Sequence, residues 1–123
     1  MVAQGHTVLV VEDDEALRML CRVNLELEGY RVLEAGNASA AAQLWRGQDV
    51  SVVLLDVHLG NDNGLELLAR MRSAEGGPAV ALLTGSVEVD AARRAAVEGV
   101  IQKPFTLDEL TSTVERLAAL GLR

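Results

Sequence analysis

Short apolar runs alternate with amphipathic stretches along the whole chain. Two of the runs, at residues 7–11 and 51–55, are nearly continuously apolar, which is typical of strands covered on both faces of a sheet. The pattern predicts five strands, at residues 7–11, 31–35, 50–55, 79–83 and 100–102. Strands that alternate with helices favour an α/β fold with a parallel sheet and right-handed crossovers.

Each stretch between or after the predicted strands carries apolar residues at helical spacing, and we expect each such stripe to face the core. In the first helix, the positions of the stripe are 0, 4, 7 and 11 residues from its start. The stripes are Ala16, Leu20, Val23 and Leu27; Ala38, Ala41, Ala42 and Trp45; Leu65, Leu68 and Met71; Ala91, Ala92, Ala95 and Ala96; and Leu107, Leu110, Val114 and Leu117.

Length and composition fit one domain with an aliphatic core. Of the 123 residues, 50% are hydrophobic and only 2% are aromatic, so Val, Leu and Ala must fill the interior. We expect a core over about residues 6–120 and no output domain. Cys21 is the only cysteine and cannot form an internal disulfide, which fits a reducing compartment. With neither a signal peptide nor a long apolar run, a cytoplasmic protein away from the membrane is expected.

The net charge argues against nucleic acid as a partner. Formal charge at pH 7 is −7, from 11 basic and 18 acidic residues. Such a surface repels phosphate backbones, which are bound through clustered basic residues. We therefore predict no direct binding to nucleic acid.

Chemically useful side chains stand at the ends of four of the five predicted strands. Parallel strands of an open sheet present their carboxyl ends at one edge, where ligands gather. These side chains are Glu12, Asp13 and Asp14 after the first strand, Asp56 after the third, Thr84 at the end of the fourth and Lys103 after the fifth.

Each of these features has a simpler explanation when taken alone. Acidic residues that open a helix are favoured by capping and by the helix dipole. Thr84 would also serve as a helix cap, and Lys103 as a solvated surface lysine. Asp56 is harder to explain, because a carboxylate next to a buried strand needs a partner. The joint occurrence at one sheet edge favours a functional site.

The ordered motifs resemble the receiver domains of bacterial two-component response regulators. They read VLVVEDD at residues 8–14, VLLD at 53–56, LLTG at 82–85 and KPF at 103–105. The resemblance covers essentially the whole chain, in the family's order. It implies a flavodoxin-like (βα)5 fold with strand order 2-1-3-4-5, and chemotaxis-regulator-like function as a phosphorylation-dependent switch or phosphorelay shuttle.

The resemblance also implies a role for each residue of the site. Asp56 would be the phosphoacceptor, and a magnesium ion, replaceable by manganese, would assist it. The metal ligands would be Glu12, Asp13, Asp56 and the backbone carbonyl of His58, while Thr84 and Lys103 would contact the phosphoryl group. A cis bond between Lys103 and Pro104 is expected. The donor would be a histidine kinase or a histidine phosphotransfer protein, and a downstream protein target is possible.

The chemistry is consistent with these roles. Three converging carboxylates repel one another, and a hard divalent cation with oxygen ligands relieves that repulsion. Phosphoryl transfer requires positioning and neutralisation of the phosphoryl oxygens more than covalent chemistry. Slow self-dephosphorylation by water is expected, so we interpret the domain as an acceptor that acts only on itself and not as a turnover enzyme.

Two departures from the family pattern bear on signalling. Val100 stands where the family usually has Tyr or Phe, so the usual aromatic switch residue is missing. From Thr84 to Lys103 is 19 positions, about three fewer than the family resemblance implies, which predicts a shortened fourth helix. The loop after Asp56 has Gly60 where proline is common, and the side chain of His58 is interpreted as a surface group.

Other functional classes fit less well. A haloacid-dehalogenase-type hydrolase needs a second acid two residues after its aspartate, where this chain has His58. A flavin-binding module needs a hydroxyl-rich and Gly-rich loop after the first strand, where this chain is acidic. The absence of GxxxxGK[ST] excludes a P-loop nucleotide site. The sequence leaves the cognate kinase, the pathway and the oligomeric state open.

Overall fold

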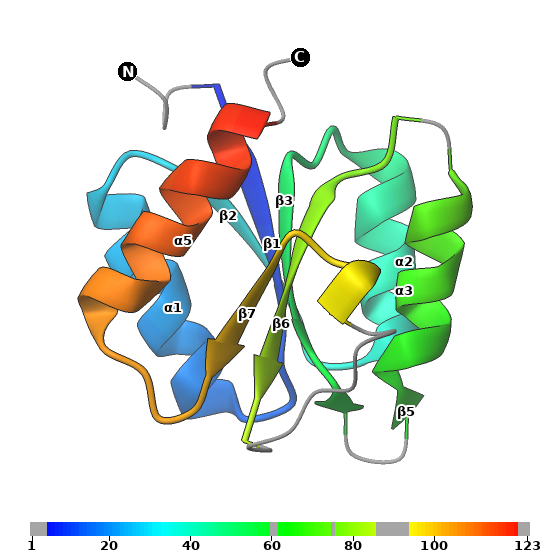
Figure 1. The fold of residues 1–123 in the computed structure, drawn as a ribbon, viewed down its shortest axis with the longest axis horizontal. Helices are drawn as coiled ribbons and strands as arrows, with labels where there is room; N and C mark the ends of the chain where they lie inside the picture. The colour runs from blue at the N-terminus through cyan, green and yellow to red at the C-terminus, as the bar shows by residue number, and fades with distance from the viewer. Residues whose placement is uncertain (1–4, 60–61, 75, 86–93, 121–123) are drawn as a thin grey trace.

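A five-stranded parallel sheet forms the centre of the molecule (Figure 1). The computed structural model describes residues 5–59, 62–74, 76–85 and 94–120. The sheet has the order β2-β1-β3-β6-β7. Its strands are β1 (Thr7–Val11), β2 (Arg31–Ala35), β3 (Val52–Asp56), β6 (Ala79–Thr84) and β7 (Gly99–Gln102). Because β6 and β7 are the fourth and fifth strands of this sheet, the predicted order 2-1-3-4-5 is confirmed.

The strand boundaries differ from the prediction in ways that affect the site. The third strand begins at Val52 and ends on Asp56, and the fourth ends on Thr84, so both side chains belong to regular sheet. A two-stranded antiparallel pair, β4 (His58–Leu59) and β5 (Asp62–Asn63), follows β3. This pair was not predicted, because two-residue strands carry no readable alternation.

Helices cover both faces of the sheet, as Figure 1 shows. On one face lie α1 (Glu15–Leu27) and α5 (Leu107–Leu120), and on the other lie α2 (Ala38–Gly47) and α3 (Gly64–Ser73). Alternate residues of β1 serve the two layers, since Val8 and Val10 pack toward α1 and α5 while Leu9 and Val11 pack toward α2. None of the described helices has the length and apolar character to cross a membrane. Of the predicted fourth-helix stripe, Ala91 and Ala92 lie outside the described residues, whereas Ala96 packs against the core on the α2 and α3 side.

The predicted core stripe of the first helix is wrong. Leu20, Val23 and Leu27 are 44%, 39% and 79% exposed, whereas Cys21 and Leu25 are fully buried. Apolar residues occupy more than one side of α1, so their spacing alone did not determine which side faces the sheet.

Two ion pairs accompany the observed orientation of α1. Arg18 Nε lies 3.3 Å from Glu34 Oε1, and Arg22 Nε lies 2.8 Å from Glu34 Oε2. Glu34 is on β2, so both arginines are held at the edge of the sheet beside α1. In α5, Leu107 is also exposed, while the other three predicted stripe residues, Leu110, Val114 and Leu117, are buried.

Candidate functional site

The side chains predicted from the strand ends come together at one edge of the sheet. Asp56 and Thr84 are the last residues of neighbouring strands, and Glu12 follows the strand on the other side of β3. Glu12, Asp56 and Thr84 are only 1%, 4% and 2% exposed. Burial of two carboxyl groups this close together is costly unless cations or shared protons compensate.

Lys103 supplies the positive charge that faces the two buried carboxyl groups. Its Nζ atom donates to Glu12 Oε1 at 2.9 Å and Oε2 at 3.2 Å, and lies 3.6 Å from Asp56 Oδ2. The backbone helps to place it, because Lys103 N donates to Thr84 O at 2.7 Å. The Lys103–Pro104 peptide bond is cis, which confirms the prediction.

The acidic run after β1 divides into two functions. Asp14 is the N-cap of α1, and its Oδ1 accepts from the backbone N–H groups of Ala16 and Leu17. Glu12 and Asp13 instead lie near Asp56, and one ligand oxygen from each of the three can be found within 4.8 Å of the others. Capping therefore explains Asp14, whereas Glu12 and Asp13 remain candidates for the site.

This donor set suits a divalent metal ion. Three carboxylates, of which Asp13 is exposed to solvent, offer hard oxygen ligands on one side and room for water on the other. The acidic cluster thus supports divalent metal binding at this edge.

The electrostatics of the cluster bear on the state without metal. Burial, together with a hydrogen bond to Asp56, raises the pKa of Glu12 from 4.5 to about 7 despite the opposing effect of Lys103. Burial lowers the pKa of Lys103, but the hydrogen bond to Glu12 and the charges of Glu12 and Asp56 outweigh it and raise that pKa above its usual value. Protonation of Glu12 therefore relieves repulsion that a bound cation would otherwise relieve.

Two residues that support the site were missed by the sequence interpretation. A Cβ atom on Gly64 would lie 2.6 Å from the backbone oxygen of Asp56, so only glycine lets α3 begin this close to Asp56. Arg18 Nη1 donates to Glu12 O at 2.8 Å and so ties α1 to the loop that carries the acid pair. Gly64 could have been noticed as a glycine immediately before a helical stripe, whereas nothing local indicated Arg18.

Some predicted features stay untested. The side chain of His58 lies outside the description, and its carbonyl as a metal ligand remains a prediction. Val100 is half-buried on β7, and the effect of valine in place of the usual aromatic residue stays a prediction. The spacing that predicts a shortened fourth helix falls on residues 86–93, which the structure does not describe.

The family model and similar curated proteins all indicate the same family. The family model described as "Response regulator receiver domain" matches residues 8–115. The probable transcriptional regulatory protein TcrX of Mycobacterium tuberculosis is 38% identical over 120 residues, which span 95% of this chain and 50% of TcrX. The sensor histidine kinase AruS of Pseudomonas aeruginosa is 37% identical over 110 residues, 84% of this chain and 11% of AruS. The chain thus spans half or less of these relatives.

The chain also resembles, in fold, a solved structure that was determined in complex with a magnesium compound. The response regulator protein TrrA of Thermotoga maritima, solved in complex with Mg(2+)-BeF, superimposes with a TM-score of 0.78. It is 27% identical, and the match covers 91% of this chain and 98% of that one.

Proposed function

The chain belongs to the response regulator receiver domain family of two-component signalling, and from this premise we propose that Asp56 accepts the phosphoryl group. The observation that carries the assignment is the position of this carboxyl group. It is buried at the end of β3, with Lys103 Nζ 3.6 Å from one oxygen and two further carboxyl groups beside it.

In the proposed transfer, a carboxylate oxygen of Asp56 attacks the phosphorus of a phosphohistidine. A new O–P bond forms as the P–N bond breaks, and the donor histidine keeps the electron pair and regains a proton. Lys103 is already directed at Asp56 and donates to the incoming phosphoryl oxygens, while the Thr84 hydroxyl at the end of β6 approaches another. Water can later attack the same phosphorus, so the domain would dephosphorylate itself slowly without acting as a turnover enzyme.

The metal of this reaction is proposed to be magnesium, with manganese as a substitute. Its ligands would be Asp13, Asp56 and the His58 carbonyl, with Glu12 close behind. When bound, it supplies positive charge against the acidic cluster and the phosphoryl group. The arrangement of Lys103 fits this division, because the lysine lies against Glu12 and leaves the exposed carboxyl group of Asp13 open to a cation.

The phosphodonor is proposed to dock beside Lys103. A groove of about 420 Å³ there is lined by Leu17, Leu20, Lys103, Pro104 and Phe105, and it is mostly apolar. Leu20 is 44% exposed although it is a large aliphatic residue. A surface of this kind next to the acceptor suits the apolar face of a histidine-bearing helix from a histidine kinase or a histidine phosphotransfer protein.

Mass spectrometry tests the acceptor. Treatment with acetyl phosphate and magnesium should add one phosphoryl group to the intact protein, and Asp56→Asn should add none. Asp49→Asn removes an exposed aspartate from the same protein and should label normally. Labelling of Asp56→Asn at the wild-type level would overturn the assignment.

Calorimetry tests the metal site with two neighbouring variants. Asp13→Asn should lose most magnesium affinity because it removes a proposed ligand. Asp14→Asn alters only the helix cap and should keep it. Equal affinities in the two variants would contradict the proposed ligand set.

A further inference from the structure

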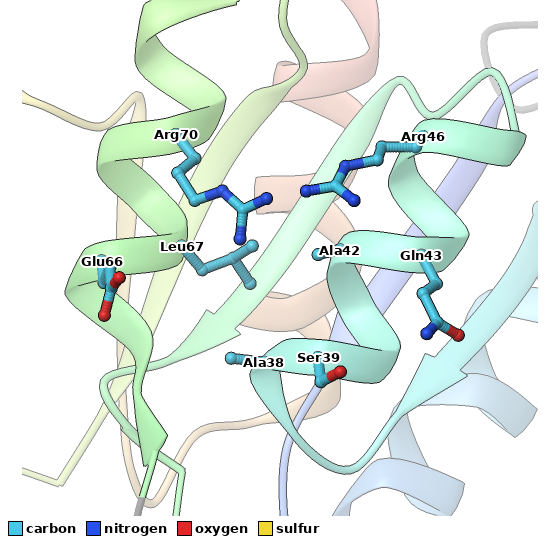
Figure 2. Close-up of a pocket in the computed structure, with 8 residues that line it drawn as sticks. All are labelled: Ala38, Ser39, Ala42, Gln43, Arg46, Glu66, Leu67 and Arg70. Atoms are coloured by element: carbon cyan, nitrogen blue, oxygen red, sulfur yellow. The ribbon is translucent and has the colours of Figure 1, made fainter.

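A groove between α2 and α3 holds two arginines that the phosphoryl site does not use. Its volume is about 310 Å³. Figure 2 shows the side chains of Arg46, in the last turn of α2, and Arg70, on α3, reaching toward each other across the space between the helices. Ala38, Ala42 and Leu67 line the groove around them, and Ala42 and Leu67 are nearly fully buried.

Neither guanidinium group has a counter-charge within the described parts of the chain. Neither the Arg46 nor the Arg70 side chain takes part there in an ion pair or a hydrogen bond. Other arginines of this protein are neutralised, as Arg22 is by Glu34 and Arg72 is by Glu98. Two facing cations repel each other. Although the net charge of the chain is −7, this groove therefore attracts an anion.

The shape and lining restrict the kind of anion. A volume near 310 Å³ falls at the lower end of the range for small-molecule sites, roughly 300–1,000 Å³. Two guanidinium groups can each donate paired hydrogen bonds to phosphate oxygens. Ala42 and Leu67 line the groove but are only 4% and 2% exposed, so they offer a ligand almost no surface, and recognition falls to the two guanidinium groups.

We propose that the groove between α2 and α3 binds a diphosphate group, free or as part of a nucleotide, with its oxygens between Arg46 and Arg70. The Ser39 hydroxyl at the same groove offers a further hydrogen bond to the phosphate. This site shares no residue with the cluster around Asp56, and so it does not depend on the assignment of the phosphoacceptor.

Glu66 provides an internal test of the electrostatics. It lines the groove and stands four residues before Arg70, a spacing at which opposite charges on a helix can pair. Its carboxylate is directed away from the facing guanidinium groups in Figure 2. Since a carboxylate at this spacing can compete for Arg70, Glu66→Gln should strengthen diphosphate binding.

An NMR titration of the isotope-labelled protein with pyrophosphate, in EDTA so that no metal bridges the anion and the acidic cluster, tests the proposal. We expect saturable amide shifts confined to residues 38–46 and 66–70. Arg46→Ala and Arg70→Ala should each weaken binding by about tenfold or more. Arg94→Ala, which removes another exposed arginine, should leave the affinity unchanged.

Comparison of probes tests the ligand class. Pyrophosphate and ADP should bind with similar affinity because both carry the diphosphate group, whereas adenosine, which lacks the phosphates, should not bind. Absence of pyrophosphate binding, or tighter binding of adenosine or of a glutamate-rich peptide, would overturn the diphosphate assignment, as would shifts that never saturate. Both arginine variants should still label at Asp56 with acetyl phosphate, so failure here and failure of the phosphoacceptor assignment are separate results.

Discussion

Replacing Glu12 by glutamine should stabilise the metal-free protein at neutral and higher pH, although it removes an ion pair with Lys103. Glu12 is 1% exposed, and its pKa is raised from 4.5 to about 7 by burial and by the hydrogen bond with Asp56. Folding therefore takes up a proton between these two pH values. The stability from that proton is complete below about pH 4.5 and is lost as the pH rises through about 7.

The size of the effect follows from the two pKa values. The difference between 4.5 and about 7 corresponds to about 3 kcal/mol of folding free energy. Glutamine resembles the protonated carboxyl group at every pH and avoids this loss. At about pH 8, Glu12→Gln should exceed the wild type by up to about 3 kcal/mol, equivalent to about 10 °C in Tm. Toward pH 4.5 the two proteins should converge.

Urea unfolding followed by circular dichroism, in EDTA and at several pH values, measures this difference. Glu115→Gln, an exposed position on α5, makes the same change in net charge and should follow the wild-type pH dependence. The reasoning is refuted if Glu12→Gln loses stability in parallel with the wild type as the pH rises. It is equally refuted if the wild type is flat across the interval.

Three further predictions concern the backbone, the docking groove and the switch. Gly64→Ala should slow phosphorylation and cost about 1–3 kcal/mol of stability, because its Cβ would lie 2.6 Å from a backbone oxygen; acetyl phosphate labelling and urea unfolding measure both. Leu20→Glu should slow transfer from a histidine kinase but not labelling by acetyl phosphate, because it charges only the apolar groove. With Val100 in place of the aromatic, a beryllofluoride mimic should change hydrogen exchange at residues 84–89 and leave residues 107–117 unaffected.

Each of these predictions has a control variant or an outcome that would contradict it. Gly47→Ala adds a Cβ with nothing within 4 Å and should be neutral or stabilising, so an equal loss at both glycines would contradict the close-approach argument. Leu27→Glu, on the same helix but not part of the groove, should leave kinase transfer unchanged; loss of transfer there would show that the groove is not the docking surface. New protection along α5 together with phosphorylation-dependent dimers would show that output uses α5 without the aromatic.

Most residues of the candidate site could be predicted from the sequence because they stand at the ends of strands. Strands buried on both faces give apolar runs, and the polar residue that ends each run lies at the end of the strand and is therefore identifiable. Asp56 and Thr84 were found in this way. Parallel strands then bring their carboxyl ends to one edge, so proximity followed from the fold class. Lys103 followed the weakest strand, and its motif with Pro104 made it identifiable.

Only the tertiary structure determined which side of a helix is buried and which distant side chains meet. Apolar residues lie on several sides of α1, so its periodicity did not select Cys21 and Leu25 as the buried pair. A run of adjacent acids contains no signal that separates the cap Asp14 from the site pair. The contact between Lys103 and Glu12 joins residues 91 positions apart, and the facing of Arg46 and Arg70 depends on how α2 and α3 lie together. Local patterns determine which elements form and where they end, whereas pairing between distant side chains depends on how each element is rotated and packed.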